Sequence, residues 1–363
     1  MRIWIAADIS ADSIGGVMRS LKETSVALKK RGHVVKIITR QKTGRGNYIG
    51  FSLQLGLRMM LAVFNRPDWI IARSTDGLAC AMLSRLFGLN TRIALHSHGW
   101  EEFAFDIEKK MPRSVVNNPT SVKGLAIRFP LLRQALKSVH LVINGTLYET
   151  QRLKKKFPKH ANKIVYLPNG TYPKPSAHWV ENASRPFTFL AVGNSSWKKN
   201  IRHSLHVFEL LKEKMPEAKM ICAGTGVDDE AFGAVFGIAK PDGVINLPEV
   251  SFSDIDQWYC ECPYLIFSSR YEGGHPFTLL EAMSNGLVVF AAPIPSVAEI
   301  VKDGESGFHI GALNAADDAN TILSVIKKRS DLDSIRERAA EVAAEYDWKI
   351  VSASLEELLC RKA

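Results

Sequence analysis

The sequence predicts an α/β protein made of two halves, each organised around a parallel sheet. Short apolar runs of strand length alternate with amphipathic helical patterns at short spacing, as in β-α-β units with parallel strands. The alternation pauses at residues 168–175, which are rich in turn-forming residues, and starts again at residue 187. The 363 residues also exceed what a single hydrophobic core usually holds, so two domains are expected.

The first half opens with an expected strand at residues 3–6 and a loop that ends in Gly15 and Gly16. An amphipathic pattern then predicts a helix over residues 17–30, which stops at Gly32. The remaining elements expected here are strands at 34–39, 69–72 and 92–95 and helices at 53–64 and 77–87. We expect the first domain to comprise residues 1–170.

The second half repeats this opening, with a strand at residues 187–193, a glycine-containing loop and a helix at 204–214. The later elements expected are strands at 219–223, 264–267 and 288–291, helices near 254–260 and 279–283, and a segment at 296–301. A helical pattern from residue 331 to residue 359 closes the chain. We expect the second domain to comprise residues 171–345.

The composition is that of a soluble globular protein, with 46% hydrophobic and 23% charged residues. The first residues run directly into a strand pattern without a signal-peptide cleavage region, and no apolar stretch is long enough for a spanning helix. The five cysteines are scattered, and Cys260 and Cys262 have the wrong spacing for a zinc knuckle. We therefore expect a cytoplasmic protein with reduced thiols.

A formal net charge of +10 calls for a partner or a reason. Basic residues cluster at residues 29–31, 40–45 and 152–163. Aromatic residues are not interleaved with them as in single-strand binders, so nucleic acid is not an expected partner. Two interpretations of these clusters stay open. They form a surface that binds an anionic membrane, or they form a surface that is only solvated.

Two carboxylates, Glu272 and Glu281, flank a tight turn in the most informative segment of the chain. The turn reads Gly273, Gly274, His275 and Pro276, and it follows the apolar run 264–267. A glycine-rich loop between a strand and a helix is where α/β sheets bind ligands. Carboxylates repel phosphate but accept hydrogen bonds from paired hydroxyls, which favours a sugar beside a phosphate. The alternative is a solvated loop whose carboxylate stabilises a helix N-terminus, with Glu281 opening the helix.

Two adjacent lysines, Lys198 and Lys199, stand in the loop that opens the second half, before the helix. Cations are unfavourable at a helix start, so their presence there favours a bound anion. Gly15 and Gly16 occupy the equivalent loop of the first half, where glycine lets the backbone approach a diphosphate, although any tight turn would use glycine too.

His98 follows the strand expected at residues 92–95 and is a candidate for a functional histidine. His96 and His98 could instead form a metal pair, but no third ligand is suggested by the spacing, and no metal is expected. A histidine with a purely structural role is the remaining alternative. Gly224, in a Gly-Thr-Gly turn after the strand 219–223, is a Rossmann-type turn.

These motifs, in this order, resemble the large family of retaining glycosyltransferases that use nucleotide sugars and have two Rossmann-like domains, the group 1 or family 4 type. The usual family form places seven residues between the two glutamates, whereas eight separate Glu272 from Glu281 here. Asn194 stands where the family has arginine, and Arg202 and Arg270 are candidates to supply the missing cation. The resemblance implies the GT-B fold, with two domains that face a central cleft and a C-terminal helix, residues 346–363, that returns to the first domain.

The resemblance also implies roles for individual residues. Glu272, His98 and Lys199 are the expected catalytic residues, with Lys199 on the donor phosphates and Glu281 on the ribose diol. The expected donor-binding residues are Gly15, Gly16, Asn194, Lys198, Lys199, Gly224, Gly273, Gly274, His275, Pro276, Phe277, Thr278 and Glu281.

The implied activity is transfer of a hexose-type sugar from a UDP- or GDP-sugar to a glycan or lipid-linked glycan, with retention and without a metal or other cofactor. Such an enzyme would serve polysaccharide biosynthesis in the cytoplasm, at the inner face of the plasma membrane if its basic surface binds lipid. Two alternatives were weighed. A nicotinamide dehydrogenase is disfavoured because no Gly-x-Gly-x-x-Gly follows the first strand. A non-catalytic protein that binds sugar nucleotides or polysaccharide stays open because of Asn194 and the longer loop.

Overall fold

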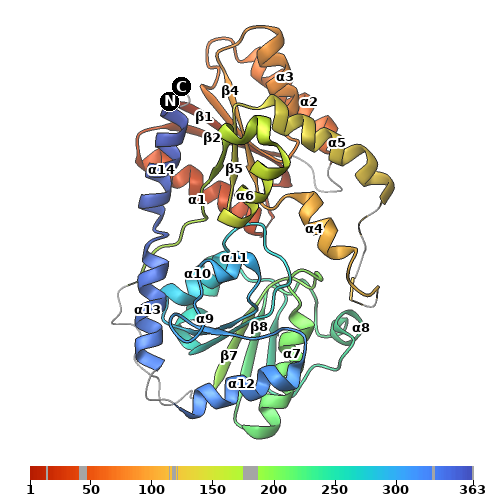
Figure 1. Ribbon diagram of the computed structural model, residues 1–363, viewed down its shortest axis with the longest axis vertical. Helices are drawn as coiled ribbons and strands as arrows, with labels where there is room; N and C mark the ends of the chain where they lie inside the picture. Colours follow the sequence, from red (N-terminus) through yellow and green to blue (C-terminus); the bar gives the residue numbers. More distant parts are fainter. Residues whose placement is uncertain are drawn as a thin grey trace. The chain divides into compact units, whose positions relative to one another are not determined.

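A computed structural model describes residues 1–13, 15–40, 47–113, 115–116, 120, 122–174, 187–328 and 332–361. The chain forms two compact units (Figure 1). Unit 1 comprises Met1–Lys110, Pro119–Asn169 and Trp348–Ala363, and unit 2 comprises Met111–Asn118 and Gly170–Asp347. Four parts of the sequence predictions lie outside the described residues, namely residues 41–45 of the second basic cluster, residue 175 of the expected boundary, residue 331 and residues 362–363 of the expected C-terminal helix.

Unit 1 is built on a six-stranded, fully parallel sheet with the order β2-β1-β3-β4-β5-β6. Its strands are β1 (Arg2–Ser10), β2 (Val34–Arg40), β3 (Trp69–Arg73), β4 (Arg92–Ser97), β5 (Leu141–Asn144) and β6 (Ile164–Tyr166). The central strands are continuous apolar runs because helices cover both of their faces.

The helices of unit 1 are α1 (Gly16–Lys30), α2 (Tyr48–Leu61), α3 (Leu78–Leu86), α4 (Glu101–Glu108), α5 (Val122–Ser138), α6 (Leu147–Lys156) and α14 (Trp348–Arg361), with a 3₁₀ turn at Pro158–Lys163. On one face of the sheet, Ile70 and Ile93 share a hydrophobic core with side chains of α2, α3 and α5. On the other face, α14 packs on α1 (Figure 1), where Glu356 of α14 pairs with Arg31 and lies 2.9 Å from His33 Nε2.

Unit 2 also has a six-stranded parallel sheet, in the order β12-β11-β10-β7-β8-β9. Its strands are β7 (Thr188–Val192), β8 (Lys219–Ala223), β9 (Val244–Leu247), β10 (Tyr264–Phe267), β11 (Val288–Ala291) and β12 (Phe308–His309). Its helices are α7 (Ile201–Lys214), α8 (Phe232–Phe236), α9 (Ile255–Glu261), α10 (Phe277–Ser284), α11 (Pro295–Ala298), α12 (Ala315–Lys327) and α13 (Leu332–Ala344). Alternate residues of each central strand enter two cores, one with α7 and α12 and one with α9, α10 and α13.

The predicted fold class, α/β with two Rossmann-like halves, is confirmed by these two parallel sheets. The helical pattern predicted over residues 331–359 comprises two helices, α13 and α14, and α14 lies within the C-terminal helix expected at residues 346–363. The break at residues 345–347 has a physical reason, since the chain passes from unit 2 to unit 1 there. The Tyr346 carbonyl accepts a hydrogen bond from the Thr171 N–H at 2.8 Å instead of continuing the helix.

Two other expectations are corrected. Helix α10 begins at Phe277 after the N-cap Pro276, so Glu281 lies in its second turn and does not open the helix. Helix α2 begins at Tyr48, five residues earlier than predicted, because Asn47 caps it by accepting a hydrogen bond from the Gly50 N–H. Among the described residues, no helix has both the length and the apolarity needed to cross a bilayer.

Candidate functional site

The sheet of unit 2 changes direction between β7 and β10, because the chain builds outward from β7 to β9 and then from β10 to β12 on the other side. Loops that leave the carboxyl ends of strands at such a switch point form the usual ligand site of an open α/β sheet. The loop after β7 carries Lys199, and the loop after β10 carries Glu272. The sheet order therefore brings together two residues that lie more than seventy positions apart in sequence.

Lys199 and Glu272 form an ion pair, with 2.6 Å between the lysine Nζ and the glutamate Oε1. The same carboxylate oxygen accepts a hydrogen bond from the Ser269 hydroxyl at 2.8 Å. The side chains of Lys199 and Glu272 are 26% and 14% exposed, so both groups remain within reach of a ligand. A polyanion could replace the carboxylate on the lysine, and a hydroxyl could replace the ammonium on the carboxylate.

The two loops hold each other in place through Asn200 and Ser268. The Asn200 side chain donates to the Ser268 carbonyl at 3.1 Å, and the Ser268 hydroxyl donates to the Asn200 carbonyl at 2.9 Å. The Arg270 N–H donates to the Lys198 carbonyl at 2.7 Å. These contacts fix the backbone on both sides of the Lys199–Glu272 pair, as a preorganised binding site requires.

Gly193 makes room for the lysine. A Cβ atom at this position would lie 3.1 Å from both Cβ and Cγ of Lys199, closer than ordinary contact. The loop after β8 contacts this loop, because the Ser195 N–H donates a hydrogen bond to the Thr225 carbonyl at 3.0 Å. Gly224, with a φ of +73°, turns the chain at the end of β8.

Arg202 and Arg270 add positive charge without a local acid. Burial, and then the nearby Arg202, lower the pKa of the Arg270 guanidinium. Within the described ranges, no aspartate or glutamate lies within ion-pair distance of either guanidinium. The two guanidinium groups are close enough to repel each other, and a bound anion would relieve this repulsion.

Asn194 and Lys198, both predicted donor contacts, lie in the same loop. Asn194 is exposed, and its side-chain oxygen accepts a hydrogen bond from the Ser196 N–H at 3.2 Å. The Lys198 ammonium lies 5.8 Å from the centre of the Trp197 ring and 5.4 Å from that of Tyr271, within cation–π range. The aromatic rings thus stabilise Lys198 in its present position.

The residues of the glycine-rich turn that leads into α10 differ in their burial and contacts. The His275 side chain is 1% exposed, with its Nε2 2.8 Å from Glu299 Oε2 and its ring edge-on to Tyr346. The side chain therefore faces the protein and does not point toward a ligand site. Glu281 is 7% exposed. The other predicted residues of this turn and helix start are buried or partly buried, namely Gly273, Gly274, Pro276, Phe277 and Thr278.

In unit 1, Gly15 is the N-cap of α1 and Gly16 its first residue. No side chain caps this terminus, so its first backbone N–H groups have no helical partner. These groups follow β1 at the carboxyl edge of the unit 1 sheet, where an anion could accept their hydrogen bonds. Gly15, Gly16 and His98 belong to unit 1 and the other predicted site residues to unit 2.

His98 lies directly after β4, and its Nε2 is buried with no hydrogen-bond partner among the residues that the structure describes. Burial, with His96 and Arg73 nearby, holds the pKa of His98 well below its ordinary value, so the ring is neutral. A buried ring nitrogen with no partner is costly, and a polar ligand group would satisfy it.

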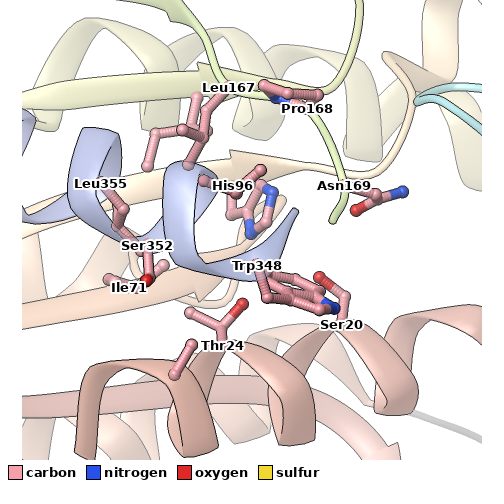
Figure 2. A pocket seen from close by; sticks show the side chains of 13 residues that line it. Ser20, Thr24, Ile71, His96, Leu167, Pro168, Asn169, Trp348, Ser352 and Leu355 are labelled. Carbon is pink, nitrogen blue, oxygen red and sulfur yellow. The ribbon is translucent and has the colours of Figure 1, made fainter. Parts of the chain in front are cut away.

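His96, two residues before His98, lines a small cavity within unit 1. Figure 2 shows its ring beside a cavity of about 10 Å³, little more than the room of one water molecule. The cavity lies between α1 and α14, where Thr24, Trp348 and Ser352 also line it. Burial lowers the pKa of His96 to about 4. No group of three metal-binding side chains occurs among the residues that the structure describes.

Sequence reasoning missed Asp76, which follows β3 at the same edge of the unit 1 sheet. Its carboxylate accepts a hydrogen bond from the Asp8 N–H at 2.8 Å, and burial raises its pKa to about 7. Two residues earlier, Ser74 has a positive φ of 48°, which is unusual for a residue other than glycine. The sequence carries no signal for this conformation.

Two parallel-sheet units and a lysine–carboxylate pair at a switch point define a nucleotide-binding protein of the two-Rossmann class. A family model described as "Glycosyltransferase Family 4" matches residues 14–174, and one described as "Glycosyl transferases group 1" matches residues 174–342. The chain belongs to this family of glycosyltransferases with the GT-B fold, as the sequence motifs predicted.

The chain is 26% identical over 164 residues to the poly(glycerol-phosphate) alpha-glucosyltransferase of Bacillus subtilis, which covers 45% of this chain and 24% of that protein. Matches to curated relatives span between 11% and 41% of their length. In fold, the chain is similar to sucrose-phosphate synthase of Thermosynechococcus elongatus (TM-score 0.77, 13% identity, 99% of each chain). It is also similar to Anabaena HepE in complex with UDP and glucose (TM-score 0.70, 19% identity, 99% and 100% of the two chains).

Proposed function

We propose that the protein transfers a hexose-type sugar from a nucleoside diphosphate sugar to an acceptor hydroxyl, with retention of anomeric configuration. The observation that carries this proposal is the ion pair between Lys199 and Glu272, 2.6 Å apart at the switch point of unit 2. The pair offers a cation for a phosphate and a carboxylate for sugar hydroxyls in adjacent positions. Arg202 and Arg270 lie nearby without an acidic partner in the described ranges.

Unit 2 is then the donor-binding unit, and its residues bind different parts of the nucleotide sugar. Lys199, assisted by Arg270, binds the diphosphate, while Glu272 accepts hydrogen bonds from sugar hydroxyls. Glu281, buried in the second turn of α10, accepts hydrogen bonds from the ribose diol. The backbone of Gly273 and Gly274 approaches the sugar, since these residues have no side chain to exclude it.

The chemistry needs stabilisation of a developing oxocarbenium ion and of a departing diphosphate. Lys199 and Arg270 stabilise the negative charge on the leaving group without a metal ion, since their charges are already in place. The leaving phosphate accepts the proton of the acceptor hydroxyl on the same face, which retains the configuration. His98, neutral at physiological pH, is available to hydrogen-bond the sugar through its unpartnered Nε2.

Unit 1 is the proposed acceptor-binding unit. The name of the Bacillus subtilis relative refers to poly(glycerol-phosphate), and an anionic glycan or lipid-linked acceptor suits a chain with a net charge of +10. UDP is the favoured nucleotide because the similar HepE structure holds UDP and glucose, and GDP is the alternative. The proposed setting is polysaccharide biosynthesis in the cytoplasm.

The predicted basic clusters could attract an anionic membrane, but internal contacts use several of their residues. Arg31 pairs with Glu356, Arg152 lies 3.2 Å from Asp106, and Lys156 pairs with Glu102. Lys163 donates to two backbone carbonyls, and burial lowers its pKa to about 8. Exposed cations remain at Lys29, Lys30, Lys154, Lys155 and Lys159, and peripheral membrane binding stays part of the proposal.

Thermal-shift measurements with UDP, GDP, ADP and their sugars test donor binding directly. A ligand held at a hundred times its dissociation constant should stabilise the chain by about 2.7 kcal/mol. We expect UDP or GDP to stabilise the wild-type protein and to stabilise Glu281→Ala less, because its ribose contact is lost. Equal shifts for wild type and variant would contradict the role of Glu281.

A further inference from the structure

Helix α2 exposes a row of large apolar side chains. Phe51, Leu55 and Met59 do face the sheet and are buried. The opposite row, spaced by four residues, is exposed and comprises Ile49, Leu53, Leu57 and Leu61. A helix on the surface of a soluble protein normally places charged or polar residues on its exposed face. Helix α2 instead has apolar side chains on both its buried and its exposed face.

The exposed row continues beyond α2. Val63 and Phe64, just after the helix, are 63% and 91% exposed. On α3, Met82, Leu86 and Phe87 are also exposed. We call these nine side chains, from Ile49 to Phe87, the α2–α3 face.

The two helices touch closely enough to join their exposed rows. A Cβ at Gly56 of α2 would lie 2.9 Å from Leu83 and 3.2 Å from Ala79 of α3, and the helices lie side by side in Figure 1. The exposed row of α2 lies next to the face on which Gly56 contacts α3. On α3, Met82 and Leu86 are exposed and each lies three residues after a residue of this contact, Ala79 or Leu83. Large apolar side chains exposed on two helices in contact are a candidate interaction site.

The charged residues on α2 and α3 themselves are basic, whereas Asp68, which accepts a hydrogen bond from the Arg2 N–H, lies at the edge of the face near Phe64. Residues 47–67 and 77–92 contain no aspartate or glutamate, but they contain four arginines. Arg58 on α2 and Arg85 on α3 are exposed, and neither forms an ion pair within the described part of the chain. Apolar side chains bordered by free arginines match a surface that is apolar inside and anionic at its boundary.

A polar cavity borders the same helix. It has a volume of about 150 Å³ and lies at the carboxyl ends of β1 and β2, where Asp8 and Arg40 line it. Gln54 and Arg58 of α2 line it from the other side, next in sequence to the exposed Leu53 and Leu57. An anionic head group held at Arg58 would therefore leave its apolar part beside the exposed leucines.

We propose that the α2–α3 face docks unit 1 onto the surface of an anionic lipid bilayer. Leu57, Leu61 and Phe64 enter the boundary between head groups and acyl chains, and Arg58 and Arg85 contact the lipid phosphates. This docking rests on the proposed function, in which unit 1 binds the acceptor. The α2–α3 face is the surface that brings unit 1 to a lipid-linked acceptor. It differs from the basic clusters at residues 29–31 and 152–163, which lie on α1, α6 and the 3₁₀ turn.

The test uses the full chain and two kinds of vesicle, one of pure phosphatidylcholine and one of equal parts phosphatidylcholine and phosphatidylglycerol. Flotation should recover the wild-type protein with the anionic vesicles and much less with the neutral ones. The triple variant Leu57→Gln, Leu61→Gln and Phe64→Gln should bind at least tenfold more weakly. The matched control is Leu313→Gln, since Leu313 is 89% exposed in unit 2, and it should bind like wild type.

A second pair of variants separates the α2–α3 face from the basic clusters. Arg58→Gln with Arg85→Gln should weaken binding and reduce its dependence on salt, whereas Lys154→Gln with Lys155→Gln should change it little. The reverse result would assign docking to the basic cluster and overturn the proposal. Wild-type vesicle binding by the triple variant would also overturn it.

Two measurements complete the experiment. Sedimentation of the wild-type protein at micromolar concentration should show a monomer, whereas a dimer that the triple variant dissociates would assign the face to a second copy and overturn bilayer docking. UDP-induced thermal stabilisation should be equal in wild type and the triple variant, which verifies folding. Vesicle binding without any response to nucleotide would leave docking intact and contradict the proposed function instead.

Discussion

The Lys199 ammonium lies 2.6 Å from the Glu272 carboxylate, so two groups with separate proposed tasks neutralise each other. A nucleotide sugar has to separate them, with its diphosphate taking the lysine and its hydroxyls taking the carboxylate. The pair keeps both charges satisfied in a partly buried place, where an isolated charge would be unfavourable. Donor binding is then an exchange of partners, and variants of the two residues should behave differently.

Replacing Lys199 with alanine should weaken UDP binding by about one to two orders of magnitude. Loss of a charge-assisted contact costs roughly 1.5–3 kcal/mol, and each 1.4 kcal/mol is about tenfold in affinity. Titration calorimetry with UDP measures the change. Lys219→Ala is the matched control, because Lys219 is exposed at the amino end of β8. Equal affinities in all three proteins would remove Lys199 from the site.

Replacing Glu272 with glutamine should keep or raise UDP affinity while it lowers turnover. UDP carries no donor sugar, so the variant loses no UDP contact, and Lys199 no longer has to leave a carboxylate before it binds phosphate. Turnover should fall by at least tenfold because the sugar hydroxyls lose a charged acceptor. The prediction needs both UDP affinity and initial rates. A large loss of UDP affinity would show that Glu272 positions the nucleotide instead.

Replacing Arg270 with glutamine should weaken UDP binding several-fold and reduce its sensitivity to salt. Arg270 is half-buried beside Arg202, and a bound diphosphate would relieve their mutual repulsion. The salt dependence of the dissociation constant, measured between low and physiological ionic strength, is the readout. Parallel salt profiles for wild type and variant would indicate that the two arginines do not face the phosphates.

Replacing Asp76 with asparagine should flatten the dependence of stability on pH. Burial raises the pKa of Asp76 from 3.8 to about 7, so the folded chain keeps a proton that the unfolded chain loses near pH 4. The stabilisation is fully present below pH 4 and is lost as the pH rises to about 7, a decrease of a few kcal/mol. Urea unfolding from pH 4 to pH 8 should show this decrease in wild type and a smaller one in Asp76→Asn. Identical slopes would contradict the raised pKa.

The sequence predicted those elements whose pattern is local. The strands at β8, β10 and β11 are apolar runs bounded by turn residues, and their expected bounds are those of the structure. Helix α10 was misplaced because Pro276, as its N-cap, allows the helix to begin at Phe277, before the apolar periodicity starts. The break between α13 and α14 lies at the contact of Tyr346 with Thr171, and the family resemblance rather than the local pattern indicated a separate C-terminal helix.

Motif spacing predicted which loops carry the candidate site residues, but it did not predict the orientation of their side chains. Nothing in the sequence reveals that the side chain of His275 turns inward to Glu299. The pairing of Lys199 with Glu272 depends on the order of strands in the sheet. Helix α2 is apolar on two faces, and composition alone cannot tell which of them the core covers.

Release of nucleoside diphosphate from a panel of UDP- and GDP-sugars, with and without a glycan or lipid-linked acceptor, tests the central claim most directly. The account predicts that one sugar nucleotide releases its diphosphate faster with acceptor, and that Lys199→Ala and Glu272→Gln each abolish most of the increase. The product should keep the anomeric configuration of the donor. Binding of a sugar nucleotide with no release under any acceptor, or release that survives both substitutions, would contradict it.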